Sequence, residues 1–334
     1  DNSVLDYDSL SYNDNAQLTF DLTKLVKDWY ADNEPKNGFV LEANETVGTK
    51  QVNVKDRNNT DLHPSITIIY KDFKSSENGS SFHSFTAGQN VIASVSDYLG
   101  NLVVNQPLYE GNGSRMSPSV SVTYNSIENA WAFSFNQKIT AASAEMAAFG
   151  YDYIYTDAQG ANHYLKKDDS SNEWYDEDGL GITLTVGDNT LTVENGTTQT
   201  YALPTAGGFL LSEATEKEND CTDTVSYTYS NGAVTAITNG ANQTVSVNYS
   251  NGVVASLGLP GSKTISFAYS DGQITKIIFP GNRMSRFSYN NGKLVLVEQA
   301  DSLSGSESVN SKLGFTFTGD KVTRVTEYGS DGTE

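Results

Sequence analysis

Tyrosine and glycine recur near the C-terminal end of the chain at a fixed interval of 20 residues, at Tyr229, Tyr249, Tyr269 and Tyr289 and at Gly232, Gly252, Gly272 and Gly292. Each tyrosine stands three residues before its glycine, and Asn or Asp precedes the glycine every time. Asn-Gly and Asp-Gly between β-rich runs favour type I′ turns, because both central residues need positive φ. The interval therefore predicts an array of antiparallel hairpins that bury their apolar faces against one another.

A second, looser turn closes each unit, at Asn239-Gly240, Pro260-Gly261 and Pro280-Gly281. A degenerate fifth copy, from Phe315 to Val322, follows an insertion around residues 301–312. We interpret the four tyrosines as packing residues of the sheet, because tyrosine has a broad apolar ring with a polar tip. The alternative is a stacked aromatic ladder that binds a glycan.

These segments resemble the tyrosine-aspartate (YD) repeats of RHS proteins. In that family, tandem repeats build a long β-sheet that spirals into a hollow shell, often around a C-terminal toxin domain. The resemblance implies that residues 216–334 belong to such a sheet and that their partner is the remainder of the shell. These ~120 residues are too few to close a shell, and nothing in the chain resembles the family's self-cleavage motif or a toxin.

The front of the chain combines a predicted short helix with predicted strands. Leu22, Leu25, Val26 and Trp29 fall at helical spacing, and residues 64–70 alternate like a strand. This block resembles the C-terminal half of the DNRLRE module, a jelly-roll β-sandwich similar to carbohydrate-binding modules. The matching positions are Asp21, Thr23, Val26, Trp29, Asn37, Gly38, Pro64 and Tyr70. The resemblance implies a β module over residues 1–72 with polysaccharide or cell wall as a partner, and we interpret Trp29 as a core residue.

The middle of the chain begins with a Ser/Gly/Asn-rich stretch, which predicts a linker over residues 73–90. Short β runs fill residues 91–215, and only Thr140–Ala148 favours either a short helix or a loop. Several phrases here, including Asp97 to Leu102 and Trp174 to Leu180, resemble the region that precedes YD repeats in wall-associated RHS proteins. The predicted fold class is all-β: a partial jelly-roll or β-sandwich, a β-rich middle region and an antiparallel hairpin sheet.

The sequence contains no nucleophile elbow, zinc-protease motif or phosphate loop. The three histidines share no metal-ligand spacing, and acidic neighbours of Cys221 disfavour a reactive thiolate. The run from Asp176 to Asp178 is interpreted as a solvated acidic turn, with a cation site as the alternative. Trp174 and Tyr175 are the candidate sugar-stacking pair, because polar neighbours suggest exposure. No cofactor is expected, and the sequence does not support an enzyme.

Charge narrows the possible partners. The 41 acidic residues outnumber the 21 basic ones and give a net charge of −20, which disfavours nucleic acid and anionic membranes. No apolar run reaches the ~20 residues that span a bilayer. The sequence does not open with a basic n-region and an apolar h-region, so we expect that any signal peptide has been removed or lies outside it. The abundance of Thr, Ser, Asn and Gly favours a secreted surface protein of a Gram-positive bacterium. The predicted function is a non-catalytic structural segment of a large secreted, cell-surface RHS/YD-repeat protein, as a scaffold or as the start of a toxin-enclosing β shell. The alternative is a carbohydrate-binding adhesion region that recognises wall or environmental polysaccharide.

Overall fold

The computed structural model describes residues 22 and 25 and most of residues 82–328, apart from short stretches at 89, 98, 113–115, 169, 177–180, 188–190, 195–196, 206–207, 219–220 and 304–305. The chain divides into two compact units, residues 1–69 and 70–334, and the fold below is that of the second. The predicted jelly-roll module, Trp29 included, lies outside the described residues except for Leu22 and Leu25. No helix among the described residues is long and apolar enough to cross a membrane.

Five strands form an antiparallel meander at the start of this unit: β1 (Phe82–Ala87), β2 (Val91–Ser96), β3 (Leu102–Glu110), β4 (Ser119–Asn125) and β5 (Ala130–Phe133). Leu102, Val104, Val122 and Tyr124 point to one face and are fully buried. Strand β1 falls inside the predicted linker, which is therefore too long. Its composition is polar, but Phe85 and Ala87 pack into the same core.

The next eight strands close into a barrel. They are β6 (Lys138–Ala141), β7 (Tyr151–Thr156), β8 (Asn162–Lys167), β9 (Glu173–Asp176), β10 (Thr183–Val186), β11 (Leu191–Glu194), β12 (Thr198–Thr205) and β13 (Gly208–Glu218). Each strand pairs with the next, and β13 returns to β6 where Phe209 pairs with Ile139. The interior is filled by large side chains, among them Tyr155, Leu165 and Tyr201.

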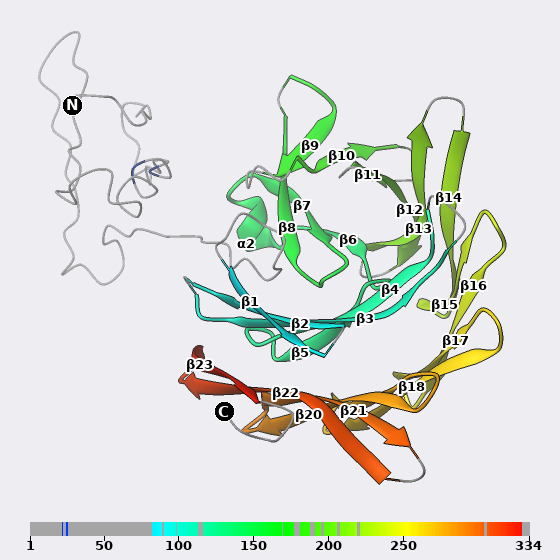
Figure 1. Cartoon of the computed structure of the whole chain (residues 1–334). Helices are drawn as coiled ribbons and strands as arrows, with labels where there is room; N and C mark the ends of the chain where they lie inside the picture. The colour runs from blue at the N-terminus through cyan, green and yellow to red at the C-terminus, as the bar shows by residue number, and fades with distance from the viewer. Residues whose placement is uncertain are drawn as a thin grey trace, which may run out of the picture. The chain divides into compact units, whose positions relative to one another are not determined.

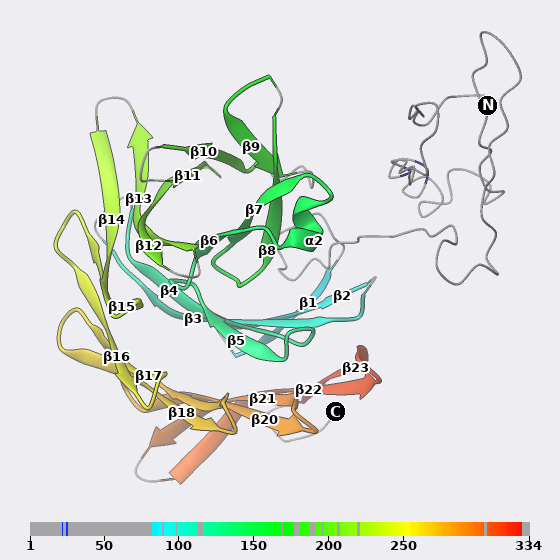
Figure 2. The ribbon, with the colours of Figure 1, turned by 180° about the vertical axis from the view of Figure 1, so that it is seen from behind.

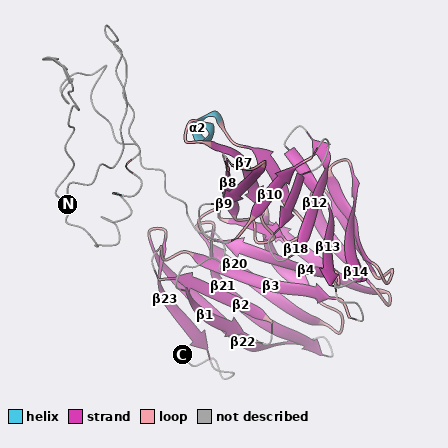
Figure 3. Cartoon of the chain, turned by 90° about the horizontal axis from the view of Figure 1, so that it is seen from above, coloured by secondary structure: helices cyan, strands magenta, loops and turns pink. Residues whose placement is uncertain are grey.

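The segment from Thr140 to Ala148 holds both a strand and a helix. Thr140 and Ala141 belong to β6 and pair with β7, so the prediction of helix is wrong for the first residues. Helix α2 (Ala144–Ala147) follows, and the Ser143 hydroxyl caps it by accepting from the Met146 N–H at 3.2 Å. Figure 3 shows α2 as a short turn beside β7 in a unit made almost entirely of strands.

The repeat region forms a second antiparallel meander that starts on β13. Its strands are β14 (Cys221–Ser230), β15 (Ala233–Asn239), β16 (Thr244–Ser250), β17 (Val253–Leu259), β18 (Lys263–Ser270), β19 (Gln273–Ile278), β20 (Arg283–Asn290), β21 (Lys293–Leu303), β22 (Ser306–Thr318) and β23 (Lys321–Tyr328). The predicted all-β fold with a hairpin sheet is confirmed. The predicted insertion around residues 301–312 lengthens β21 and β22 into one long hairpin.

The main core lies between the five-stranded sheet and the repeat sheet. Figures 1 and 2 show the five-stranded sheet between the barrel and strands β18 to β22. Its apolar face packs against inward residues of the repeats, such as Ile265, Phe287 and Phe315. Each such side chain, when fully buried, stabilises the fold by roughly 1.5–3 kcal/mol. The curved repeat sheet therefore wraps a sheet built from an earlier part of the same chain.

Candidate functional site: tyrosine bridges and the edge of the repeat sheet

The tight turns of the four repeats share one backbone conformation. Asn231, Asn251, Asp271 and Asn291 have φ between 50° and 52°, and the glycines that follow have φ between 79° and 82°. Two consecutive residues with positive φ define the type I′ turn that the Asn-Gly and Asp-Gly pairs predict. Its twist matches the twist of the flanking strands, so the same hairpin recurs along the sheet.

Each hairpin also carries a β-bulge next to its turn. Tyr269 pairs with Ile274, whereas Ala268 pairs with Lys276, so Thr275 is the extra residue. The Thr275 hydroxyl donates to the Ala268 carbonyl at 3.2 Å. The same one-residue shift in strand register occurs in the other repeats and in the fifth hairpin. A bulge increases the local twist and bends the strand, which curves the repeat sheet around its core.

Tyrosine hydroxyls join successive hairpins. Neighbouring hairpins share only three or four ladder pairs, so their turn ends splay apart. The Tyr269 hydroxyl donates to the Val254 carbonyl at 2.8 Å, and the Tyr289 hydroxyl donates to the Ile274 carbonyl at 2.6 Å. Donor and acceptor are 15 residues apart in both cases. These tyrosine bridges tie the hairpins of Tyr269 and Tyr289 each to the hairpin before it.

The first tyrosine joins the repeats to the barrel. The Tyr229 hydroxyl donates to the Leu211 carbonyl of β13 at 2.7 Å. Leu211 is fully buried in the barrel core. The side chain that bridges two hairpins elsewhere therefore anchors the sheet to the barrel at its first strand.

Removing a bridging tyrosine hydroxyl is expected to lower the free energy of unfolding, and the loss should be larger for the hydroxyl that makes more hydrogen bonds. The Tyr289 hydroxyl donates to Ile274 and accepts from the Trp131 indole N–H at 2.7 Å, whereas the Tyr269 hydroxyl donates to Val254. A typical net hydrogen bond contributes about 0.5–1.5 kcal/mol, and orphaned buried partners add to the loss. Tyr289→Phe should cost about 2 kcal/mol and Tyr269→Phe about 1 kcal/mol in urea unfolding. Equal losses, or none, would contradict this role.

Alkaline pH is expected to weaken the fold through the buried tyrosines. Burial raises the pKa of Tyr227 and Tyr269 to about 12, and it also raises the pKa of Tyr289 above its usual value of 10.0. The folded state therefore favours the neutral phenol, and this contribution to stability is complete below pH 10 and is lost as pH rises through 12. The urea midpoint should fall across that window. A midpoint that stays constant to pH 12 would contradict the burial.

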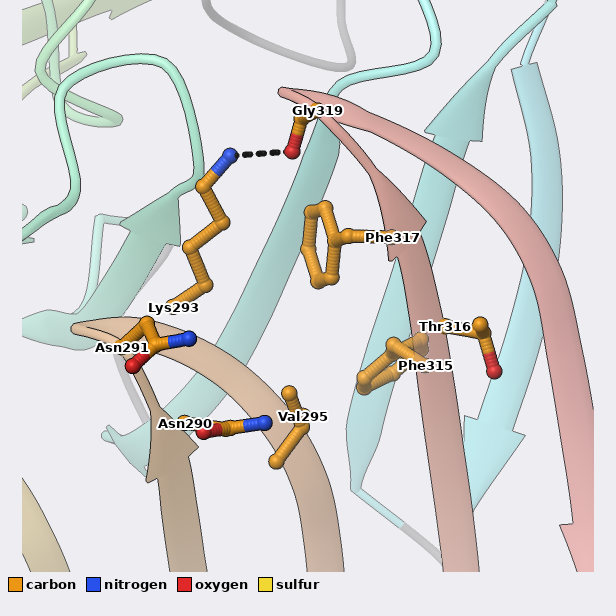
Figure 4. A pocket seen from close by; sticks show the side chains of 8 residues that line it. All are labelled: Asn290, Asn291, Lys293, Val295, Phe315, Thr316, Phe317 and Gly319. Carbon is orange, nitrogen blue, oxygen red and sulfur yellow. Dashed lines mark hydrogen bonds between the residues drawn. The ribbon is translucent and has the colours of Figure 1, made fainter.

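The fifth hairpin lacks a tyrosine bridge, because Phe317 occupies the tyrosine position and pairs with Val322. Lys293 spans the gap instead: its ammonium group donates to the Gly319 carbonyl at 2.7 Å and lies 5.2 Å from the centre of the Phe317 ring. Figure 4 shows Lys293 reaching across the gap above Phe317. An open cleft of about 450 Å³ lies here, lined also by Asn290, Asn291, Val295, Phe315 and Thr316.

Restoring the hydroxyl in this cleft is expected to stabilise the protein. Tyr289 pairs with Leu294 as Tyr269 pairs with Ile274, so Leu294 provides the equivalent acceptor carbonyl. Phe317→Tyr should raise the free energy of unfolding by about 0.5–1.5 kcal/mol. Phe315→Tyr is the matched control, because it places a hydroxyl in the packed core and should destabilise. Destabilisation by both variants would show that the cleft does not accept the hydroxyl.

A buried polar seam fixes the five-stranded sheet against the repeats. Ser285 is completely buried; its hydroxyl donates to the Gln106 side-chain oxygen and accepts from the Gln299 amide, both at 2.6 Å. Nearby, the Tyr124 hydroxyl accepts from the Leu294 N–H at 3.2 Å. Sequence reasoning missed this seam. Its one signal is Ser285, a polar residue where the earlier repeats have Val or Ile.

The two predicted sugar-stacking residues lie on opposite faces of β9. Trp174 is buried in the barrel, where its indole N–H donates to the Asp152 carboxylate at 2.6 Å. Tyr175 is 42% exposed. The predicted exposure is therefore wrong for Trp174, because successive strand residues alternate between faces. The structure does not bring the two rings together as one platform.

The other residues considered in the sequence, Asp176, His163 and Cys221, all lie in or next to strands of the fold. Asp176 ends strand β9 and is buried, and its carboxylate accepts from the Ile182 N–H at 2.8 Å, so the predicted solvated turn is wrong for this residue. Glu177 and Asp178 lie outside the described residues. His163 is buried 3.0 Å from the Asp157 carboxylate. Cys221 begins β14, but its side chain is not described. Within the described part of the chain, no group of three or more His, Cys, Asp or Glu side chains could hold a metal ion.

Comparison with known proteins finds only weak structural similarity. No family model and no curated protein matches the chain. It is similar to a chain of the Tc holotoxin pore of Photorhabdus luminescens, with 13% identity, a TM-score of 0.29 and coverage of 71% of this chain and 11% of that one. It is also similar to TcdB2-TccC3, with 13% identity, a TM-score of 0.28 and coverage of 80% and 17%. The chain spans less than a fifth of either structure's chain.

Proposed function

We propose that this chain is a non-catalytic structural segment of a larger RHS/YD-repeat protein, in which it forms part of the wall of a β shell that encloses a toxin. The observation that carries the proposal is the tyrosine bridge, by which the hairpins of Tyr269 and Tyr289 are tied to their neighbours. A sheet of such units extends by repetition without a change in geometry. The partner is then the remainder of the same shell.

The proposed setting is the surface of a secreting Gram-positive bacterium. The net charge of −20 and the Ser- and Thr-rich composition suit a solvated extracellular protein. The repeats support this, since the threonines Thr228 and Thr244 on their strands are exposed.

An adhesion function is the second candidate, and two observations favour it. Tyr175 presents an exposed ring, and the cleft beside Phe317 combines an aromatic ring with the amides of Asn290 and Asn291. Aromatic rings with a few placed polar groups are the usual elements of ligand sites.

Calorimetric titration of the chain with neutral and acidic polysaccharides and with peptidoglycan, with and without Ca²⁺, separates the two functions. The structural function predicts no saturable binding. Saturable binding that is lost in Tyr175→Ala or Phe317→Ala would replace it with adhesion. Turnover of any of these polymers would show that the protein is an enzyme.

A further inference from the structure

The cleft beside Phe317 lies where the fifth hairpin lacks a tyrosine bridge. The Ile274 carbonyl accepts the hydroxyl of Tyr289 at 2.6 Å, and Leu294 takes the position of Ile274 in the next hairpin. The residue that should carry the next hydroxyl is Phe317, whose ring has none. The Leu294 carbonyl therefore receives no tyrosine hydroxyl from the fifth hairpin.

The Leu294 carbonyl faces the gap between the two hairpins because of its place in the ladder. Leu294 pairs with Tyr289, next to the pair that closes the tight turn. Such a pair is of the non-hydrogen-bonded kind, so the peptide groups of Leu294 point away from β20 and toward β22. The ladder between β21 and β22 ends at Leu296, before it reaches Leu294. A hydroxyl donor that enters the gap can therefore use this acceptor.

The residues around this gap depart from the repeat pattern. Where the earlier repeats carry Ala, Val and Gln the cleft has Lys293, and where they carry Ser it has Asn290. Figure 4 shows Asn290, Asn291 and Lys293 on one side of the gap and the rings of Phe315 and Phe317 on the other. The two asparagines are exposed, whereas Phe317 is half-buried. The cleft of about 450 Å³ thus combines apolar rings with a few polar groups, as small-ligand sites do.

The charges at the cleft favour a neutral aromatic ligand. The Lys293 ammonium group donates to the exposed Asp320 carboxylate and lies 5.2 Å from the centre of the Phe317 ring. Because the carboxylate balances the charge of the lysine, an anionic ligand gains little here. A second aromatic ring beside the ammonium group would gain a cation–π contact.

We propose that the cleft binds a phenol ring, the chemical group that a tyrosine side chain of a partner peptide supplies. The phenol hydroxyl donates to the Leu294 carbonyl, and the ring lies against Phe317 beside the Lys293 ammonium group. The carboxamides of Asn290 and Asn291 offer both donors and acceptors, which match the peptide groups on either side of a tyrosine. This inference goes beyond the proposed function, which needs no ligand at the cleft.

Titration of the full chain with N-acetyl-tyrosine amide, followed by NMR, tests the site. The side-chain amide signals of Asn290 and Asn291 and the backbone amide signal of Gly319 should shift on binding. N-acetyl-phenylalanine amide differs only by the hydroxyl and should bind about two- to tenfold more weakly, which is the value of one hydrogen bond. p-Cresol has no peptide groups: binding weaker than that of the tyrosine amide identifies a tyrosine side chain as the ligand, and equal binding identifies a free phenol.

Two variants locate the binding. Phe317→Tyr supplies the protein's own hydroxyl to the Leu294 carbonyl and should remove the preference for the tyrosine amide. Phe149→Ala deletes an exposed ring after α2, far along the chain from the cleft, and should leave binding unchanged.

Equal binding of the two amides, or a preference for the tyrosine amide that persists in Phe317→Tyr, would overturn the inference. Polysaccharide binding that shifts the same signals, without binding of the tyrosine amide, would also overturn it and would assign the cleft to adhesion. A cleft that binds no phenol leaves the structural function in a shell wall intact, so the two failures are distinguishable.

Discussion

Gly208→Ala is expected to destabilise the protein by at least about 4 kcal/mol, the largest effect of any single substitution considered for this fold. Gly208 has φ of 125°, which side chains rarely adopt, and an added Cβ would stand 2.1 Å from the Ile139 carbonyl oxygen. Backbone strain of this kind costs about 1–3 kcal/mol, and the clash with a backbone atom adds to it. Because Gly208 lets β13 approach β6, the substitution opens the barrel at the strand that also begins the repeat sheet.

Urea unfolding and the mass in solution together test this prediction. The opened β6 and β13 edges should promote self-association in addition to the loss of stability. Gly181→Ala is the matched control, since Gly181 also has positive φ but has nothing within 4 Å of the added Cβ. It should cost about 1 kcal/mol and leave the protein monomeric. If the two variants behaved alike, barrel closure would not depend on the close approach at Gly208.

Trp131→Ala is expected to cost about 2–4 kcal/mol and to loosen the five-stranded sheet from the repeats. The Trp131 ring lies edge-on to Phe287 with centroids 4.7 Å apart and contacts Tyr124 at 5.5 Å. Its indole N–H donates to the Tyr289 hydroxyl. The Trp131 side chain of β5 therefore both packs against aromatic rings and hydrogen-bonds to the hydroxyl of a bridging tyrosine.

Trp131→Phe separates the two contributions, because it keeps a ring and removes the N–H donor. It should cost about 1–2 kcal/mol. Hydrogen exchange should accelerate in β5 and β20 in the alanine variant more than in the barrel strands. Uniform acceleration across the whole unit, or no change at β20, would contradict a specific seam between the two sheets.

The repeat hairpins could be predicted from the sequence because their signals are local. Asn-Gly at Asn251 and Gly252 requires a particular pair of backbone conformations, and the alternation before it specifies which face is apolar. The interval of 20 residues then multiplies one hairpin into a sheet. The fifth hairpin was recognisable from Phe317 and Val322 for the same reason.

The barrel and the seam could not be predicted, because they depend on contacts between distant residues. Closure depends on Gly208 meeting Ile139, and nothing near either residue indicates a partner 69 positions away. Polar composition likewise concealed the strand at Phe82–Ala87. At Trp174, polar neighbours suggested exposure, whereas strand alternation turns the ring inward. The composition of a segment indicates only its average exposure to solvent, whereas the alternation along a strand determines whether each single side chain is buried or exposed.

Electron cryo-microscopy of a natural, longer chain that contains this segment tests the central claim most directly. The account predicts that residues 221–328 lie in the wall of a hollow β shell and that the barrel closes one end of their sheet. A map in which the repeats lie outside any shell wall would contradict it.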